Sequence, residues 1–153
     1  QYTEEFINHI LEEQQFPQLH AFLIMDVDKF KSVNDTYGHA VGDIVLEQFG
    51  KLLKSHFRGY DIVGRIGGDE FVVLMKNVGT KETAYARVDE FVKKVRDFKY
   101  EEMDGKGVTT SIGLAFAYED GDCYMDLYKA ADVELYQAKK AGGDGFYVRE
   151  KKE

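Results

Sequence analysis

A glycine pair at positions 67–68 stands between two strand-like runs, residues 61–63 and 71–75, and this pattern constrains the fold more than any other stretch. Paired glycines tolerate the positive φ that tight turns require, so we expect the two runs to form an antiparallel hairpin. The next residues, Asp69 and Glu70, place carboxylates on that turn. Acids on a rigid turn suit a metal ion or a polarised hydroxyl. A solvated hairpin tip is the alternative, because turns favour Gly and Asp for conformational reasons alone.

Helical and strand-like patterns alternate along the rest of the chain. Helical spacing of apolar residues predicts helices at 2–14, 40–57, 80–98 and 124–141, and apolar or β-branched runs predict strands at 21–25, 108–116 and 146–148. Residues 29–37 fit a short helix or an ordered loop. This order predicts an α/β chain, specifically an α+β sandwich with the ferredoxin-like βαββαβ arrangement, in which helices flank a central, mainly antiparallel sheet. The hairpin and the missing G-x-G-x-x-G motif argue against the competing parallel Rossmann sheet.

Length and charge limit the classes of function. The 153 residues fit one domain, 1–153, with no repeat or composition shift that marks a linker. A net charge of −8, from 28 acidic and 20 basic residues, argues against a nucleic-acid partner. No apolar run reaches the roughly 18 residues of a membrane helix, and no secretory signal opens the chain. We therefore expect a cytoplasmic protein, alone or as the cytoplasmic part of a membrane-anchored one.

Four acids are expected to meet at one edge of the sheet. Asp26 and Asp28 end the apolar strand 21–25 and point to the same side, since side chains alternate along a strand. If this strand neighbours the hairpin, Asp69 and Glu70 join them. Carboxylates this close raise one another's pKa unless cations separate them, and Mg²⁺ would do so. Lys31 and Lys139 are then available for phosphate groups, although most lysines merely solvate a surface.

Asn34 and Asp43 form a second polar pair, on either side of a glycine-containing break. An aspartate can accept hydrogen bonds from N1–H and the exocyclic amine of guanine, which adenine does not offer, and an asparagine can complete the base edge. Helix caps and turns, which both residue types favour, are the plainer explanation of this pair.

Four blocks of sequence resemble the GGDEF domain, the diguanylate cyclase family. The signature R-I-G-G-D-E-F is complete at 65–71, and residues 26–43, D-V-D-K-F-K-S-V-N-D-T-Y-G-H-A-V-G-D, are similar to the family's second block. V-T-T-S-I-G at 108–113 and A-D-V-E-L-Y-Q-A-K at 131–139 resemble its third and fourth blocks. Four ordered blocks are far more specific than one motif. The resemblance also implies the palm-like fold of nucleotide cyclase catalytic domains.

The resemblance implies an Mg²⁺-dependent nucleotidyltransferase that condenses two GTP molecules to cyclic di-GMP and pyrophosphate. Each protomer of an antiparallel homodimer would hold one GTP, so one chain supplies half of the site. By position, the resemblance implies that Asp26, Asp69 and the Val27 carbonyl bind the metal cofactor, Mg²⁺ or Mn²⁺. It implies that Asn34 and Asp43 bind guanine and that Lys31 and Lys139 bind phosphate. At Gly67 and Gly68 it implies a close approach of the backbone to the nucleotide. Asp69 is the implied proton acceptor, and Glu70 is required by the motif without one assignable role.

Arg58 and Asp61 form an R-x-x-D pattern before the hairpin. It resembles the family's inhibitory site, where cyclic di-GMP binds and blocks productive docking, because arginine pairs with phosphate or guanine and aspartate with the guanine edge. An ordinary ion pair at a helix end is the alternative.

Two departures from the family pattern qualify this reading. Gly143 stands where the family has a phosphate-binding arginine, so GTP binding is expected to be weaker or to depend on Lys31 and Lys139. The D-x-L-T-G-L-x-N-R segment that opens the family's domain is missing before Gln1, which suggests an output domain separated from an N-terminal regulatory partner. The missing arginine also leaves an alternative function open, a catalytically weak module that acts as a receptor for GTP or cyclic di-GMP.

Overall fold

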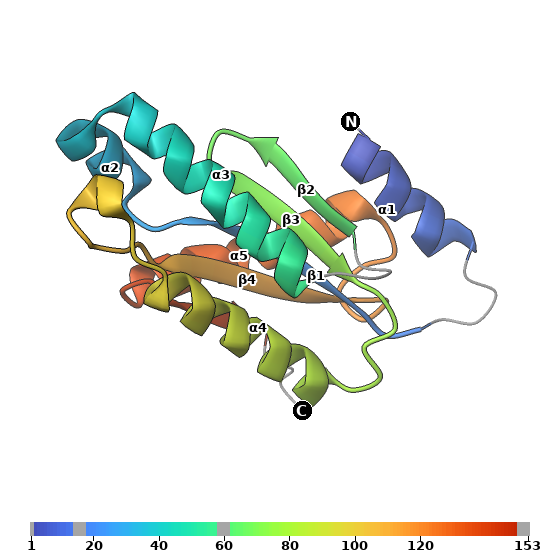
Figure 1. The fold of residues 1–153 in the computed structure, drawn as a ribbon. Helices are drawn as coiled ribbons and strands as arrows, with labels where there is room; N and C mark the ends of the chain where they lie inside the picture. The colour runs from blue at the N-terminus through green and yellow to red at the C-terminus, as the bar shows by residue number, and fades with distance from the viewer. Residues whose placement is uncertain (1, 14–17, 58–61, 150–153) are drawn as a thin grey trace.

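The computed structural model describes residues 2–13, 18–57 and 62–149. Within them lie helices and strands in the order expected from the sequence (Figure 1). The helices are α1 (Tyr2–Glu13), α2 (Phe30–Tyr37), α3 (His39–His56), α4 (Lys81–Asp97), η1 (Glu101–Met103) and α5 (Tyr124–Lys140). The strands are β1 (His20–Val27), β2 (Ile62–Gly67), β3 (Glu70–Met75), β4 (Thr110–Ala117) and β5 (Gly145–Val148).

The strands form one sheet in the order β2-β3-β1-β4-β5. β1 lies at its centre, antiparallel to both β3 and β4, and β2 and β3 form the predicted antiparallel hairpin. Two crossovers, β1 to β2 through α2 and α3 and β3 to β4 through α4, complete the ferredoxin-like βαββαβ arrangement. β5 is added at the edge, parallel to β4. The predicted mainly antiparallel α+β fold is confirmed.

Helices cover both faces of the sheet, as Figure 1 shows for α3 and α4 on one side and α5 on the other. Leu23 and Met25 of β1 pack toward α3 and α4, whereas Phe22 and Ile24 pack toward α1 and α5. The sequence of a strand that is buried on both faces is a continuous apolar run, and this is why β1 could be predicted from the sequence.

Helix α5 lies unusually close to β4, because Gly113 presents no side chain at the crossing. A Cβ added at Gly113 would lie 2.0 Å from the carbonyl oxygen of Ala131 and 2.4 Å from the amide nitrogen of Leu135. This close approach brings side chains of α5 within reach of the ends of β1 and β3, where the candidate site lies.

Several boundaries differ from the predicted ones for local reasons. Residues 30–37 are helical, which decides between the two expectations for that stretch. β4 begins at Thr110 rather than at 108, because pairing with β1 starts there. Gly67 is the last residue of β2, and of the glycine pair in the turn only Gly68 adopts positive φ, at 41°. No helix within the described residues is long and apolar enough to cross a membrane.

Candidate active site

A hollow of about 480 Å³ lies where β1 ends, beside the β2–β3 turn and the C-terminal end of α5. It brings together five predicted site residues from four parts of the chain. Its lining residues are Asp26, Val27, Asp28, Lys29, Phe30, Lys31, Asp69, Lys139, Gly142 and Gly143. Three acids and three lysines therefore line one space, and Asp26, Asp69 and Lys139 come to it from separate parts of the chain.

Asp26 is the most buried acid of the hollow, with 8% of its surface exposed. Its Oδ2 accepts a hydrogen bond and ion pair from Nζ of Lys139, whereas its Oδ1 is buried and has no hydrogen-bond partner among the described residues. Burial raises the pKa of the Asp26 carboxyl to about 6, although the hydrogen bond from Lys139 lowers it. A buried carboxylate with one unpartnered oxygen is a position that a cation would stabilise.

Asp28 lines the same hollow but is fully engaged by its own protein. Its carboxylate accepts hydrogen bonds from Oγ1 of Thr109 at 2.7 Å, Oγ of Ser111 at 2.5 Å and the backbone N–H of Asp144 at 2.9 Å. Asp28 therefore joins the end of β1 to the start of β4 and to the turn between α5 and β5.

That turn contains Gly143, at the position where the family resemblance led us to expect an arginine. Gly143 has a φ of 78°, and a Cβ added there would lie 2.7 Å from Oδ2 of Asp28. The next residue, Asp144, accepts both a 3.1 Å and a 2.9 Å hydrogen bond from Nε of Arg96 at the end of α4. Gly143 is therefore the residue that this turn requires, given the position of Asp28.

The turn of the hairpin consists of Gly68 and Asp69, since Gly67 pairs with Glu70. Asp69 faces the hollow, but Glu70 is not among the hollow's lining residues in the part of the chain that the structure describes. Glu70 lies opposite Asp26 in the β1–β3 register and accepts a 2.5 Å hydrogen bond from the hydroxyl of Tyr128 on α5. The expected convergence thus holds for Asp26, Asp28 and Asp69, while Glu70 points toward α5.

Asn34 lies on α2 and Asp43 on α3, and Gly42, the residue before Asp43, lies against the side chain of Asn34. Oδ1 of Asn34 is buried and unpartnered within the described ranges, and it lies only 1.9 Å from the place that a Cβ on Gly42 would take. Asp43 is exposed, as is Lys31 on the first turn of α2. An unpartnered amide oxygen on α2 and an exposed carboxylate on α3 are compatible with recognition of a polar base edge.

The glycines of the signature leave the hairpin turn open. A Cβ added at Gly67 or Gly68 would meet no described atom within 4 Å, so a ligand can approach this backbone. The predicted inhibitory pair, Arg58 and Asp61, lies outside the described residues.

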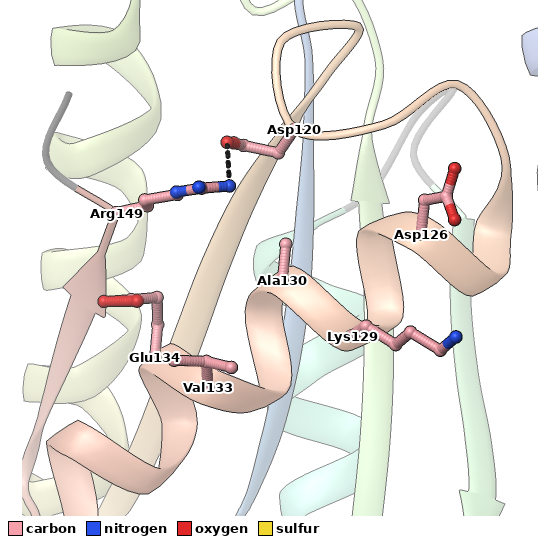
Figure 2. Close-up of a pocket in the computed structure, with 7 residues that line it drawn as sticks. All are labelled: Asp120, Asp126, Lys129, Ala130, Val133, Glu134 and Arg149. Carbon is pink, nitrogen blue, oxygen red and sulfur yellow. Dashed lines mark ion pairs between the residues drawn. The ribbon is translucent and has the colours of Figure 1, made fainter.

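A second hollow, of about 450 Å³, shares no lining residue with the first. Figure 2 shows it beside α5, with Asp126 and Lys129 on that helix and Arg149 facing Asp120. Arg149 and Asp120 form an ion pair at 3.8 Å. Charges of both signs line this hollow, and none of them belongs to the predicted site.

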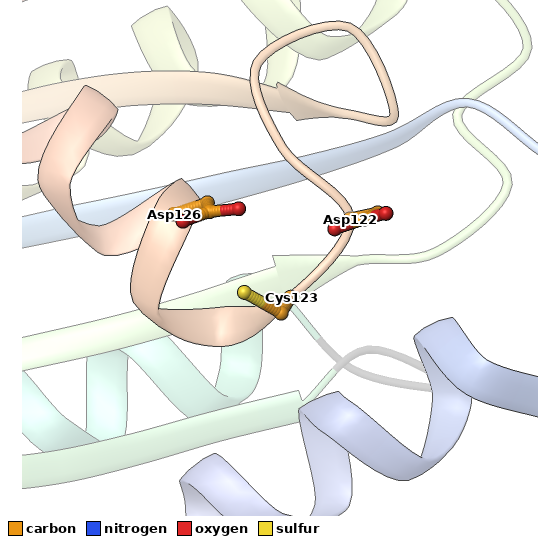
Figure 3. Close-up of side chains that lie close together, drawn as sticks. All are labelled: Asp122, Cys123 and Asp126. Carbon is orange, nitrogen blue, oxygen red and sulfur yellow. The ribbon is translucent and has the colours of Figure 1, made fainter.

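Asp122, Cys123 and Asp126 form a small cluster at the start of α5 (Figure 3), with possible ligand atoms all within 4.8 Å of one another. Both acids are exposed and Cys123 is half-buried. Solvated residues of a turn need no ligand to explain this arrangement, and the single cysteine gains no catalytic role from it.

Sequence reasoning missed the residues that hold the site in place. Tyr128, Arg96 and Ser111 contact acids that lie 58, 48 and 83 residues away along the chain. Such contacts leave no local pattern. Only the small residue at position 143, in place of the expected arginine, signalled that this turn is built differently.

Comparison with known proteins supports the assignment of the fold. A model of the GGDEF family, described as "Diguanylate cyclase, GGDEF domain", matches residues 1–145. Diguanylate cyclase A of Treponema denticola is 41% identical over 124 residues, which cover 80% of this chain and 33% of that protein. Diguanylate cyclase DgcS of Shewanella oneidensis is 35% identical over 141 residues, or 92% of this chain and 46% of that protein. The chain thus spans between a third and a half of the length of these two relatives.

A solved structure shares the fold almost throughout. The GGDEF domain of YfiN from Pseudomonas aeruginosa superposes with a TM-score of 0.89 at 29% identity, covering 99% of this chain and 95% of that one. The active GGEEF domain of a diguanylate cyclase from Vibrio cholerae superposes with a TM-score of 0.80 at 27% identity, covering 88% of this chain and 85% of that one. With the signature on the β2–β3 turn and the family match over residues 1–145, the chain belongs to the GGDEF domain family of diguanylate cyclases.

Proposed function

We propose that this chain condenses two GTP molecules to cyclic di-GMP and releases pyrophosphate. The observation that carries the proposal is the hollow in which Asp26 and Asp69 meet Lys31 and Lys139, in a chain whose relatives are named diguanylate cyclases. Sites of phosphoryl transfer typically combine carboxylates that bind a divalent metal with cationic side chains that bind phosphate. In such sites positioning and electrostatic stabilisation account for most of the rate acceleration.

The donor set fits Mg²⁺ or Mn²⁺. Asp26 and Asp69 supply carboxylate oxygens and Val27 lines the same hollow, where its carbonyl would complete the set. Oδ1 of Asp26 is buried without a partner among the described residues, so a hard cation there would remove a cost of burial. When bound, such a cation would neutralise charge that develops on the phosphate oxygens.

The residues of the chain supply the remaining steps. Lys31 and Lys139 would hold the phosphates, and Lys139 would leave Asp26 to do so. The Asp69 carboxylate would take the proton of the ribose 3′-hydroxyl as that oxygen attacks the α-phosphorus of the other GTP. The new O3′–P bond forms as the bond from the α-phosphorus to the bridging oxygen breaks and pyrophosphate leaves. Two such displacements close the ring.

The guanine would be read by Asn34 and Asp43. A carboxylate accepts from the adjacent N1–H and exocyclic amine of guanine, whereas adenine has an acceptor at N1 and so does not offer this pair of donors, and ATP would leave a polar group unpaired. Because each GTP supplies one attacking hydroxyl and one attacked phosphorus, a homodimer with one nucleotide per protomer is part of the proposal.

The test is turnover of GTP by the isolated chain at high protein concentration with Mg²⁺, with cyclic di-GMP measured by chromatography. The rate per protomer should rise with protein concentration, and ATP should give no cyclic product. Asp69→Asn should abolish turnover, whereas Thr80→Ala, a helix-cap change outside the hollow, should leave it unchanged. Absence of product under conditions in which the chain is dimeric would refute the proposal.

Product inhibition at Arg58 and Asp61 belongs to the same proposal and rests on the R-x-x-D pattern alone. Arg58→Ala should remove inhibition by added cyclic di-GMP and leave the initial rate unchanged. Inhibition that persists in this variant would place the inhibitory site elsewhere.

A second candidate function is a receptor that binds GTP or cyclic di-GMP with little turnover. It is favoured by Gly143, because the turn that holds this glycine has no room for the family's arginine. Calorimetry discriminates between the two functions. A receptor binds nucleotide stoichiometrically without releasing pyrophosphate over hours, whereas a cyclase consumes GTP.

A further inference from the structure

The turn that carries Asp69 has little packing of its own. Its residues are Gly68 and Asp69, and a Cβ added at Gly67 or Gly68 would meet no described atom within 4 Å. The ladder between β2 and β3 is also irregular between Arg65 and Gly67. An open, glycine-rich turn does not by itself hold a carboxylate in one place, yet a metal ligand must be held within about half an ångström.

Two hydrogen bonds flank this turn and supply what packing does not. Nε of Arg65 on β2 donates to the carbonyl oxygen of Gly68 at 2.8 Å. On the other side, the hydroxyl of Tyr128 donates to Oε1 of Glu70 at 2.5 Å, the length of a charge-assisted O–H···O⁻ bond. The turn is thereby tied to its own strand at one end and to helix α5 at the other.

Tyr128, which holds one side of this turn, is itself packed against rigid elements of the fold. Its ring lies 5.9 Å from that of Tyr124, which packs edge-on against Phe22 of the central strand at 5.5 Å. The neighbouring residues Leu127 and Ala131 are fully buried, so this part of α5 is part of the core. Burial and the hydrogen bond to Glu70 both raise the pKa of the Tyr128 phenol, which therefore remains a donor at neutral pH.

The direction in which Glu70 points also matters for its neighbours. Glu70 and Asp26 are directly opposite in the β1–β3 register and share the face covered by α5. Tyr128 draws the Glu70 carboxylate toward α5, and the hollow is then lined by Asp26 and Asp69 but not by Glu70 within the described residues. One fewer carboxylate in the hollow reduces the mutual repulsion between the acids that line it.

We propose that Tyr128 is a positioning residue: by holding Glu70 against α5 it fixes the Gly68–Asp69 turn, so that Asp69 faces the metal-binding hollow. This assigns the second acid of the signature an anchoring role for the turn. The inference rests on the proposed metal-dependent function of the same hollow, and it concerns a residue that touches neither metal nor nucleotide.

The test is the variant Tyr128→Phe, which removes one hydroxyl and keeps the ring. Titration of the nucleotide-free chain with Mn²⁺, followed by electron paramagnetic resonance, should show metal binding weakened about 10-fold, as for loss of other supports of metal ligands. In turnover, kcat should fall by a similar factor while the KM for GTP stays within about 2-fold, since guanine and phosphate contacts are untouched. A KM that rises in step with the fall in kcat/KM, at constant kcat, would overturn the proposal.

Tyr118→Phe is the matched control. It also removes a tyrosine hydroxyl from a half-buried hydrogen bond, here to the carbonyl oxygen of Leu11 at 3.1 Å, away from the hollow. Its Mn²⁺ affinity should equal that of the unchanged chain. Equal weakening in both variants would mean a general loss of stability and would overturn the proposal.

A double-mutant cycle with Glu70→Ala tests whether Tyr128 acts through Glu70. Tyr128→Phe should have no further effect on Mn²⁺ affinity once Glu70 is absent, and additive effects would overturn the proposal. Because Mn²⁺ binding is measured without turnover, the outcome is separate from that of the proposed function. A chain that binds Mn²⁺ but makes no cyclic di-GMP refutes the cyclase and leaves this test in force.

Discussion

Replacing Gly143 by alanine tests whether the turn after α5 accepts any side chain at the position where the resemblance led us to expect an arginine. Gly143 has a φ of 78°, in the left-handed region that residues with a Cβ avoid, and the added Cβ would lie 2.7 Å from Oδ2 of Asp28. That oxygen accepts hydrogen bonds from Thr109 and from the backbone of Asp144. The substitution therefore carries a backbone penalty and also a collision with a hydrogen-bonded carboxylate.

The two penalties can be estimated separately. Left-handed backbone costs a residue other than glycine roughly 1–2 kcal/mol. Displacing Asp28 far enough to accept the new methyl group breaks at least one hydrogen bond to a charged group, worth about 1.5–3 kcal/mol. Gly143→Ala should therefore lower the free energy of unfolding by about 2.5–5 kcal/mol.

Gly105→Ala is the matched control, because Gly105 has the same φ of 78° and a Cβ there would meet no described atom within 4 Å. It should cost only the backbone penalty, roughly 1–2 kcal/mol. Urea unfolding of the metal-free chain, followed by circular dichroism, measures both. Equal losses in the two variants would refute the collision with Asp28.

If the collision is real, Gly143→Arg should be no more stable than Gly143→Ala and should gain no GTP affinity. A stable Gly143→Arg variant with tighter GTP binding would therefore also refute the collision with Asp28.

Three further predictions follow from single contacts. Burial raises the pKa of Asp26 from 3.8 to about 6, so the folded state retains a proton that the unfolded state has released, and stability falls as pH rises through this window. Asp26→Asn should thus stabilise the metal-free chain by up to about 3 kcal/mol at pH 7 and by little below pH 4 in urea unfolding, while it abolishes turnover. Gly42→Ala would place a Cβ 1.9 Å from Oδ1 of Asn34, and the displaced amide should raise the KM for GTP about 5-fold in steady-state assays, the equivalent of one hydrogen bond. Thr80→Ala removes the side-chain acceptor for the N–H of Thr83 at the start of α4 and should cost about 1 kcal/mol of stability with unchanged turnover.

The elements of the fold were predictable where burial follows a local period. α4 places Val88, Phe91 and Val95 on one buried stripe, and β1 is apolar on both faces because helices cover both. The hairpin then fixed the sheet as mainly antiparallel. The parallel addition of β5 and the crossing at Gly113 depend on contacts between distant parts of the chain, so no local pattern predicted them.

The candidate site was predictable where its acidic residues lie at the ends of predicted strands. Asp26 follows a buried strand and Asp69 sits on the turn of a neighbouring one, so their meeting followed from topology. The direction in which the Glu70 side chain points did not follow from topology, because it depends on Tyr128 in another part of the chain. The position of Asp28 likewise depends on hydroxyls of β4 and on the turn after α5.

Helix α5 therefore determines more of the site than its sequence block alone indicates. Lys139 near its C-terminal end holds Asp26, and Tyr128 one turn into the helix holds Glu70, while Asp26 and Glu70 are themselves partners across two strands. The helix lies close enough to do both because Gly113 leaves room for its backbone. Any change that moves α5 relative to the sheet would consequently alter both acids together. The geometry of the signature turn thus depends on the packing between α5 and the sheet as well as on the glycines and acids of the signature itself.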